Sequence, residues 1–140
     1  MRTLAGMIIA LGWGVANAAE TYSPAVNYQL QCMGCHRADG SGEPGRVPSM
    51  RRSLALLSTT PEGRDYVIRV PGVAQSPLSS EDTAALLNWM MRNLSDLRVP
   101  AGVADYSAAE VQRSRVHPLA QVKSLRARLL RAATATPAAP

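Results

Sequence analysis

Two cysteines and a histidine fall within five consecutive residues, Cys32-Met33-Gly34-Cys35-His36, and the chain of 140 residues has no other cysteine. A disulfide between cysteines three positions apart would close too small a loop to restrict the unfolded chain. One pair also cannot form a disulfide scaffold. We therefore expect these cysteines to serve a chemical purpose. A chain of this length folds as one domain, or as one domain with a tail.

The C-x-x-C-H pattern is typical of covalent haem attachment. Two thiols at this spacing can form thioethers with the two vinyl groups of one haem, and the imidazole that follows becomes the proximal iron ligand. We predict one haem c held by Cys32 and Cys35, with His36 on the iron. Aromatic residues make up only 4% of the chain, with no Phe. Because the haem would supply the large apolar ring that such a core lacks, we expect the haem-free chain to fold poorly.

Two other kinds of site use this motif. A thioredoxin-like redox pair also has C-x-x-C spacing, but it follows a strand in a βαβ unit. Here the preceding segment is helical in pattern, and a loop rich in Gly and Pro follows. A structural zinc site needs four ligands, which Cys32, Cys35, His36 and the distant His117 could supply. The second half of that set has no local spacing, so the pattern favours haem.

The N-terminus predicts export. Arg2 precedes an uncharged apolar run over 4–15, and Ala16-Asn17-Ala18 fits a small-x-small cleavage site. A membrane anchor is the alternative, although the run is shorter than the ~20 residues that span a bilayer. We therefore predict a signal peptide at 1–18 and a periplasmic protein. The remaining chain divides into a haem domain at 19–98, a basic helical extension at 99–133 and a disordered tail at 134–140.

Charge is distributed unevenly along the chain. Residues 19–110 contain eight basic and ten acidic side chains, whereas residues 111–140 contain six basic and none acidic. A basic segment can steer association with an acidic protein or an anionic membrane surface. We expect residues 111–133 to have that role, the alternative being a solvated helix face. Nucleic acid is not an expected partner, because the predicted export separates the chain from it and no aromatic residues interleave with these charges.

Capping residues and apolar periodicity predict a mostly helical chain. We expect a short helix beginning at Ser23-Pro24 and a helical turn at 53–57. A helix over 61–70 is capped by Thr60, although its Val and Ile content leaves a strand open. A loop follows between Pro71 and Pro77. The clearest helix starts near residue 80, capped by Ser79 or Ser80. A short helix at 106–115 and an amphipathic helix at 119–133 complete the prediction.

From about residue 22 to 94 the sequence resembles the monohaem class I cytochromes c. It has an aromatic residue one turn before the first cysteine, a Gly-rich loop after the histidine and a proline twelve residues after it. It also has the Leu-x-x-aromatic pair with which the family's last core helix packs on the first helix. The matching positions are Tyr28, residues 39–42, Pro48, Leu86 and Trp89. The resemblance implies an all-α, cytochrome c-like fold around a covalent haem, here with a C-terminal helical extension. It also implies that the Pro48 carbonyl accepts a hydrogen bond from His36 Nδ1.

The axial ligand loop departs from that family. The family has a methionine just before its last core helix, but residues 71–78 contain none, and Ser76-Pro77 stands roughly where Met-Pro is expected. Three sources for the sixth iron position stay open: His117, a methionine, or no protein ligand. Among the methionines, Met50 and Met90 are expected to pack in the core.

These features imply a periplasmic electron carrier that is not itself an enzyme. Its partners would be a dehydrogenase that delivers electrons or a terminal oxidase that accepts them. An open sixth position would instead suit a small-ligand sensor or a weak peroxidase, with His117 or Arg46 near the iron. A third interpretation is a cytochrome subunit of a dehydrogenase complex. In it, an apolar stripe of the extension packs on the partner: Leu119, Val122, Leu125 and Leu129.

Overall fold

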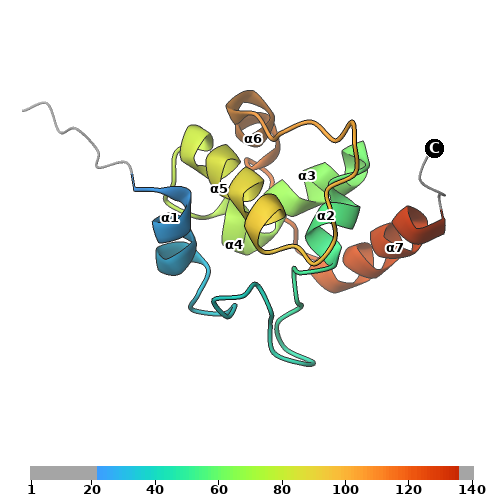
Figure 1. The fold of residues 1–140 in the computed structure, drawn as a ribbon. Coiled ribbons are helices and arrows are strands. Elements are labelled where there is room, and N and C mark those ends of the chain that lie inside the picture. The colour runs from blue at the N-terminus through green and yellow to red at the C-terminus, as the bar shows by residue number, and fades with distance from the viewer. Residues whose placement is uncertain (1–21, 136–140) are drawn as a thin grey trace, which may run out of the picture.

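The computed structural model describes residues 22–135, which form helices joined by loops (Figure 1). Within that range, β-structure is limited to one antiparallel bridge between Glu43 and Val47. The predicted all-α class is confirmed. The predicted signal peptide and residues 136–140 of the predicted tail lie outside the described residues. The helices are α1 (Pro24–Gln31), α2 (Ser53–Leu57), α3 (Pro61–Arg69), α4 (Pro71–Ala74), α5 (Ser80–Asn93), α6 (Ala108–Ser114) and α7 (Val122–Ala135).

Four helices begin where a hydroxyl side chain caps them, as the sequence predicts. Each cap oxygen accepts a backbone N–H from the first turn, at 3.4 Å for Ser23, 3.1 Å for Thr60, 2.9 Å for Ser79 and 3.2 Å for Ser107. These bonds satisfy N–H groups that have no partner inside the helix. The segment after Thr60 is helical, so the strand alternative is wrong.

Three predicted boundaries are corrected. Residues 71–74 form the short helix α4 and not a loop, because Pro71 suits a first helical turn and the Val70 carbonyl accepts the N–H of Ala74 at 2.9 Å. Helix α7 begins at Val122, three residues later than predicted. It runs to Ala135, so residues 134–135 belong to a helix and not to a tail.

The core forms where α5 packs between α1 and α6. On one side the rings of Tyr28 and Trp89 lie 5.7 Å apart, which confirms the predicted packing of the last core helix on the first. Helices α2 and α3 meet at Gly63, where an added Cβ would lie 2.0 Å from the Leu57 carbonyl oxygen. Only glycine allows the two backbones to approach this closely.

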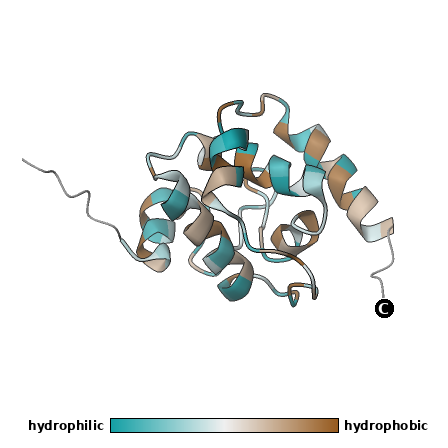
Figure 2. Ribbon diagram, turned by 90° about the horizontal axis from the view of Figure 1, so that it is seen from above, coloured by the Kyte–Doolittle hydropathy of each residue, from teal (hydrophilic) through white to brown (hydrophobic). Residues whose placement is uncertain are grey.

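The C-terminal extension packs on the same core. Tyr106 and Val111 are fully buried, and α7 lies against α2 and α3. Figure 2 shows hydrophobic and hydrophilic positions alternating around the helices, α7 included. The predicted apolar stripe packs, partly buried, against the chain's own core. This arrangement gives no support to a stripe reserved for a partner. Among the described helices, none combines the length and the apolar character that crossing a membrane requires.

Candidate haem site

The cysteine motif forms a tight turn at the end of α1. The Cys32 carbonyl accepts the N–H of Cys35 at 3.1 Å and that of His36 at 2.9 Å. The hydroxyl of Tyr28 donates to the Arg37 carbonyl at 2.6 Å, and the Arg37 N–H donates to the Ser41 carbonyl at 2.9 Å. Helix α1 and the loop after the motif are thereby tied together, and His36 is fixed between them.

The motif opens onto a largely apolar cavity of about 340 Å³. This volume lies within the range of cofactor and ligand sites. Its walls come from α1, α2, α3, α4, α5 and α7, and from the loop over 48–50, so segments far apart in the sequence enclose it. Side chains in contact with the cavity include Cys32, Cys35, His36, Pro48, Met50, Leu54, Leu57, Tyr66, Val67, Val70, Val73, Leu87, Met90, Val122 and Arg126.

The two cysteines are free thiols, and Cys32 is held in its protonated form. Burial raises the pKa of the Cys32 thiol to about 11. A redox-active C-x-x-C pair needs the opposite, a thiol pKa lowered by nearby positive charge. No strand precedes the motif among the described residues. Both observations argue against the thioredoxin-like alternative.

His36 has the protonation state that a metal ligand needs. Burial lowers its pKa, which the nearby Ser41 carbonyl offsets in part, so the ring is neutral at pH 7. Its Nδ1 is buried and has no hydrogen-bond partner among the residues that the structure describes. Pro48 borders the same cavity, but the predicted bond from Nδ1 to its carbonyl is not formed here. A buried polar nitrogen without a partner, two free thiols and an apolar cavity together fit a haem.

The sequence is similar to two known cytochromes. The chain is 30% identical over 107 residues to a cytochrome c-552 of Thermus thermophilus, in a match covering 82% of that protein and 64% of this chain. It is 29% identical over 138 residues to a second cytochrome c-552 from the same species, covering 88% of that protein and 84% of this chain. No family model matches the sequence. The chain belongs to the cytochrome c family.

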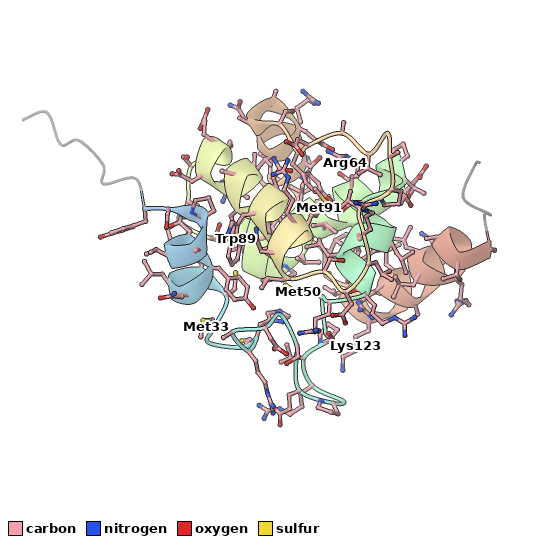
Figure 3. The ribbon with its side chains drawn as sticks, viewed as in Figure 1. Met33, Met50, Arg64, Trp89, Met91 and Lys123 are labelled. Carbon is pink, nitrogen blue, oxygen red and sulfur yellow. The ribbon has the colours of Figure 1, made fainter. Side chains whose placement is uncertain are left out.

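In this cytochrome the structure does not bring His117 to the cavity. The His117 side chain is exposed, and its backbone carbonyl accepts a hydrogen bond from Arg69 Nε at 2.8 Å. The geometry therefore gives the predicted distal role no support. Two methionines do reach the cavity, Met50 and Met90. Met50 packs beside the loop that follows His36, since its Cγ would lie 3.2 Å from a Cβ added at Gly40 (Figure 3).

The loop where the family has its methionine is held by Arg115, at the end of α6. The guanidinium donates to the carbonyls of Ala74 at 3.2 Å, Ser76 at 2.6 Å and Leu78 at 2.7 Å. Arg115 is thus a structural residue and not part of a free basic surface, which corrects one member of the predicted docking segment. The neighbouring cavity wall from α3 and α4 presents Tyr66, Val70 and Val73, with no sulfur or imidazole.

The zinc alternative also finds no support. Within residues 22–135 no three His, Cys, Asp or Glu side chains are grouped so that they could hold a metal ion together.

Sequence reasoning missed two polar residues at the cavity, Tyr66 of α3 and Arg126 of α7. Arg126 stands four positions after Val122, which places both on one face of the helix. Since Val122 was expected on the apolar stripe, that spacing could have indicated Arg126.

Proposed function

We propose that this cytochrome carries one haem c, bound through Cys32 and Cys35 with His36 on the iron, and transfers single electrons between redox proteins in the periplasm. The observation that carries the proposal is the apolar cavity bordered by these three side chains. When bound, the haem supplies the one-electron iron couple. The chain excludes water from the ring and holds the proximal imidazole neutral. The proposed signal peptide at 1–18 would deliver it to the periplasm.

Pro48 fits a supporting role at this site. His36 Nδ1 is a buried nitrogen that lacks a partner among the described residues, and Pro48 borders the same cavity. Histidines that bind metals usually donate their other ring nitrogen's proton to a carbonyl or carboxylate. A small movement of the 48–50 loop around the haem would let the Pro48 carbonyl accept this proton and fix the ring.

Expression with a bacterial haem-attachment system tests the proposal. The purified protein should show the added mass of one haem, stable to denaturation, and reversible one-electron reduction. Cys32→Ser with Cys35→Ser should abolish the added mass, whereas Met33→Ser, an exposed change inside the motif, should retain it. A wild-type chain with no covalent haem would refute the proposal.

A second candidate function rests on the α3–α4 wall, which offers the iron no methionine or histidine. An open sixth position would bind a small neutral ligand such as carbon monoxide. Rapid binding of carbon monoxide to the reduced protein would favour this sensor or weak peroxidase function. Slow or absent binding with a low-spin spectrum would favour electron transfer. In that case Met90→Leu and Met50→Leu should be compared, because the variant that loses the low-spin spectrum identifies the ligand.

The partner that we propose is an acidic redox protein. Four basic side chains of the extension are exposed, and none of them forms an ion pair with another described residue: Arg113, Lys123, Arg128 and Arg131. Exposed charges of one sign steer association more than they stabilise a complex. Arg115 and Arg126 are excluded from this surface, because both donate hydrogen bonds within the chain.

Neutralising the four exposed residues should slow electron transfer to an acidic partner at low salt and flatten its salt dependence. The matched control neutralises four exposed basic residues outside the extension: Arg37, Arg46, Arg52 and Arg98. Equal effects of the two quadruple variants would show that overall charge, and not the extension, steers association. Binding of the wild type to anionic vesicles but not to the partner would point to a membrane surface.

A further inference from the structure

The haem cavity has two chemically different ends. Cys32, Cys35 and His36 border it beside α1, while Tyr66 and Arg126 border it beside α7. Figure 1 shows α1 and α7 on opposite sides of the molecule, with α2 to α5 between them. The remaining lining is mostly apolar. Gln31 of α1 and two serines, Ser49 and Ser53, also line it, but the guanidinium of Arg126 and the Tyr66 hydroxyl lie at the end beside α7.

Arg126 lacks a partner of opposite charge within the described part of the chain. Its half-buried guanidinium donates to the Ser49 carbonyl at 3.2 Å, and no carboxylate among residues 22–135 lies within ion-pair distance. Five other arginines do pair with a carboxylate: Arg46, Arg51, Arg64, Arg69 and Arg92. A guanidinium has five N–H donors, and partial burial of an unpaired cation is unfavourable. The site therefore favours an anion.

Tyr66 adds a second donor at the same end. Its ring is buried, and its hydroxyl makes a single long bond of 3.5 Å to the Val122 carbonyl among residues 22–135. Both side chains line the same cavity, and Val122, which Tyr66 bonds, stands four positions before Arg126 on α7. Because this hydrogen bond is weak, the Tyr66 hydroxyl can turn toward a better acceptor that enters the cavity.

Haem chemistry supplies such an acceptor. The vinyl groups that form thioethers lie on one edge of the porphyrin, and the two propionate carboxylates lie on the other. If the thiols beside α1 hold the vinyl edge, the carboxylates face the end beside α7. Arginine is the side chain best suited to bind a carboxylate through paired hydrogen bonds.

We propose that Arg126 binds a haem propionate, with the Tyr66 hydroxyl as a second donor, so that α7 latches the outer edge of the haem. The inference rests on the proposed function, because it requires a haem attached at Cys32 and Cys35. It assigns the extension a role inside its own domain. Helix α7 then depends on the cofactor as well as on its partly buried apolar face.

Arg126→Gln in the haem-loaded protein tests the latch. Loss of a positive charge beside the haem disfavours the reduced iron, so the reduction potential should fall. The propionate bending band in the resonance Raman spectrum should shift, because it senses hydrogen bonds to the carboxylate. Backbone amides of α7 should exchange about tenfold faster, as one charge-assisted hydrogen bond is lost. Arg126→Lys should retain most of the potential.

Arg128→Gln is the matched control, since it removes the same charge from an exposed position on the same helix. It should leave the Raman band and the exchange of α7 at wild-type values. If Arg126→Gln carries covalent haem but behaves like Arg128→Gln in all three measurements, the latch is refuted and the proposed function stands. If the wild type carries no haem, the proposed function itself fails. Tyr66→Phe should shift the Raman band less than Arg126→Gln does, and no shift would remove Tyr66 from the proposal.

Discussion

Helices α6 and α7 belong to the same C-terminal extension, yet they are held by different kinds of contact. Around α6 the contacts are buried and polar. Asn88 of α5 accepts the Tyr106 N–H at 2.8 Å and donates to the Tyr106 carbonyl at 3.0 Å, and Val111 is fully buried. In α7 no described residue is fully buried. Its apolar side chains pack, partly buried, against the core, and among them Val122 borders the haem cavity.

This difference teaches which part of the extension depends on the cofactor. Buried hydrogen bonds are specific and costly to break, so α6 is an integral part of the core. Partly buried side chains allow local opening at low free energy. We therefore expect α6 to stay packed on the core whenever the core is folded. The packing of α7 should depend on whether a haem fills the cavity.

The largest expected effect follows from breaking the α6 attachment. Asn88→Ala removes both bonds to Tyr106 and leaves a buried N–H and a buried carbonyl without partners. The free energy of unfolding of the haem-loaded protein should fall by about 2–4 kcal/mol, measured by denaturant titration. Asn93→Ala is the control on the same helix, because Asn93 is exposed and its side-chain amide donates to the Trp89 carbonyl at 2.8 Å. Equal stability of the two variants would contradict this account of α6.

The next largest effect concerns Arg115, which joins the end of α6 to the loop before α5. Arg115→Gln loses bonds to three carbonyls of residues 74–78, so stability should fall by about 2 kcal/mol, as expected for charge-assisted bonds. The visible spectrum should also change, because this loop borders α4 at the haem cavity. Arg113→Gln removes an exposed charge from the same helix and should change neither. A wild-type spectrum and stability in Arg115→Gln would show that the loop holds itself in place.

Sequence patterns predicted the parts of this molecule that depend on local chemistry. Helix caps are one such feature, because a hydroxyl accepts a hydrogen bond from an N–H only three residues further along the chain. The four caps are Ser23, Thr60, Ser79 and Ser107. The Cys32–His36 motif and the contact between Tyr28 and Trp89 could be predicted for the same reason, or from resemblance. Each of these features depends on short spacing or on a pattern shared with a known family.

The errors lie where distant segments meet. His117 was one of three open sources for the sixth iron ligand, but Arg69 donates a hydrogen bond to its carbonyl and the residue is exposed, away from the cavity. Arg115 and Arg126 read as surface charge in the sequence, whereas packing turns one toward loop carbonyls and the other toward the cavity. A charged residue on an amphipathic helix does not reveal which acceptors its tip will meet. Only the tertiary arrangement supplies that information.

A smaller effect should separate α7 from α6. Leu129→Ala trims a side chain that is only partly buried, so the loss should be about 1–2 kcal/mol, below the range for fully buried leucines. The loss should be local: amides of α7 should exchange faster while those of α6 keep wild-type protection. Arg131→Ala changes an exposed residue two positions after Leu129 on the same helix, and it should leave the exchange of α7 unchanged. Equal acceleration in α6 and α7 would mean that the two helices open together.

The smallest expected effect is the pH dependence of the ion pair that joins α3 to α6. Arg64 Nη2 lies 2.7 Å from Glu110 Oε2, and the guanidinium stacks over the Tyr106 ring at 4.1 Å. Hydrogen bonds from Arg64 lower the pKa of Glu110 from its ordinary value of 4.5. A lowered folded-state pKa contributes stability above the ordinary pKa, and this contribution disappears as the pH falls through the folded-state value.

Glu110→Gln should therefore cost at most about 1 kcal/mol at neutral pH, because the pair is partly exposed. The gap between variant and wild type should close as the pH is lowered from about 6 to about 3, measured by denaturant titration at each pH. Glu43→Gln, which breaks the far more exposed pair with Arg46, should match the wild type throughout. A gap that stays constant with pH would mean that Glu110 acts on α6 through packing and not through its charge.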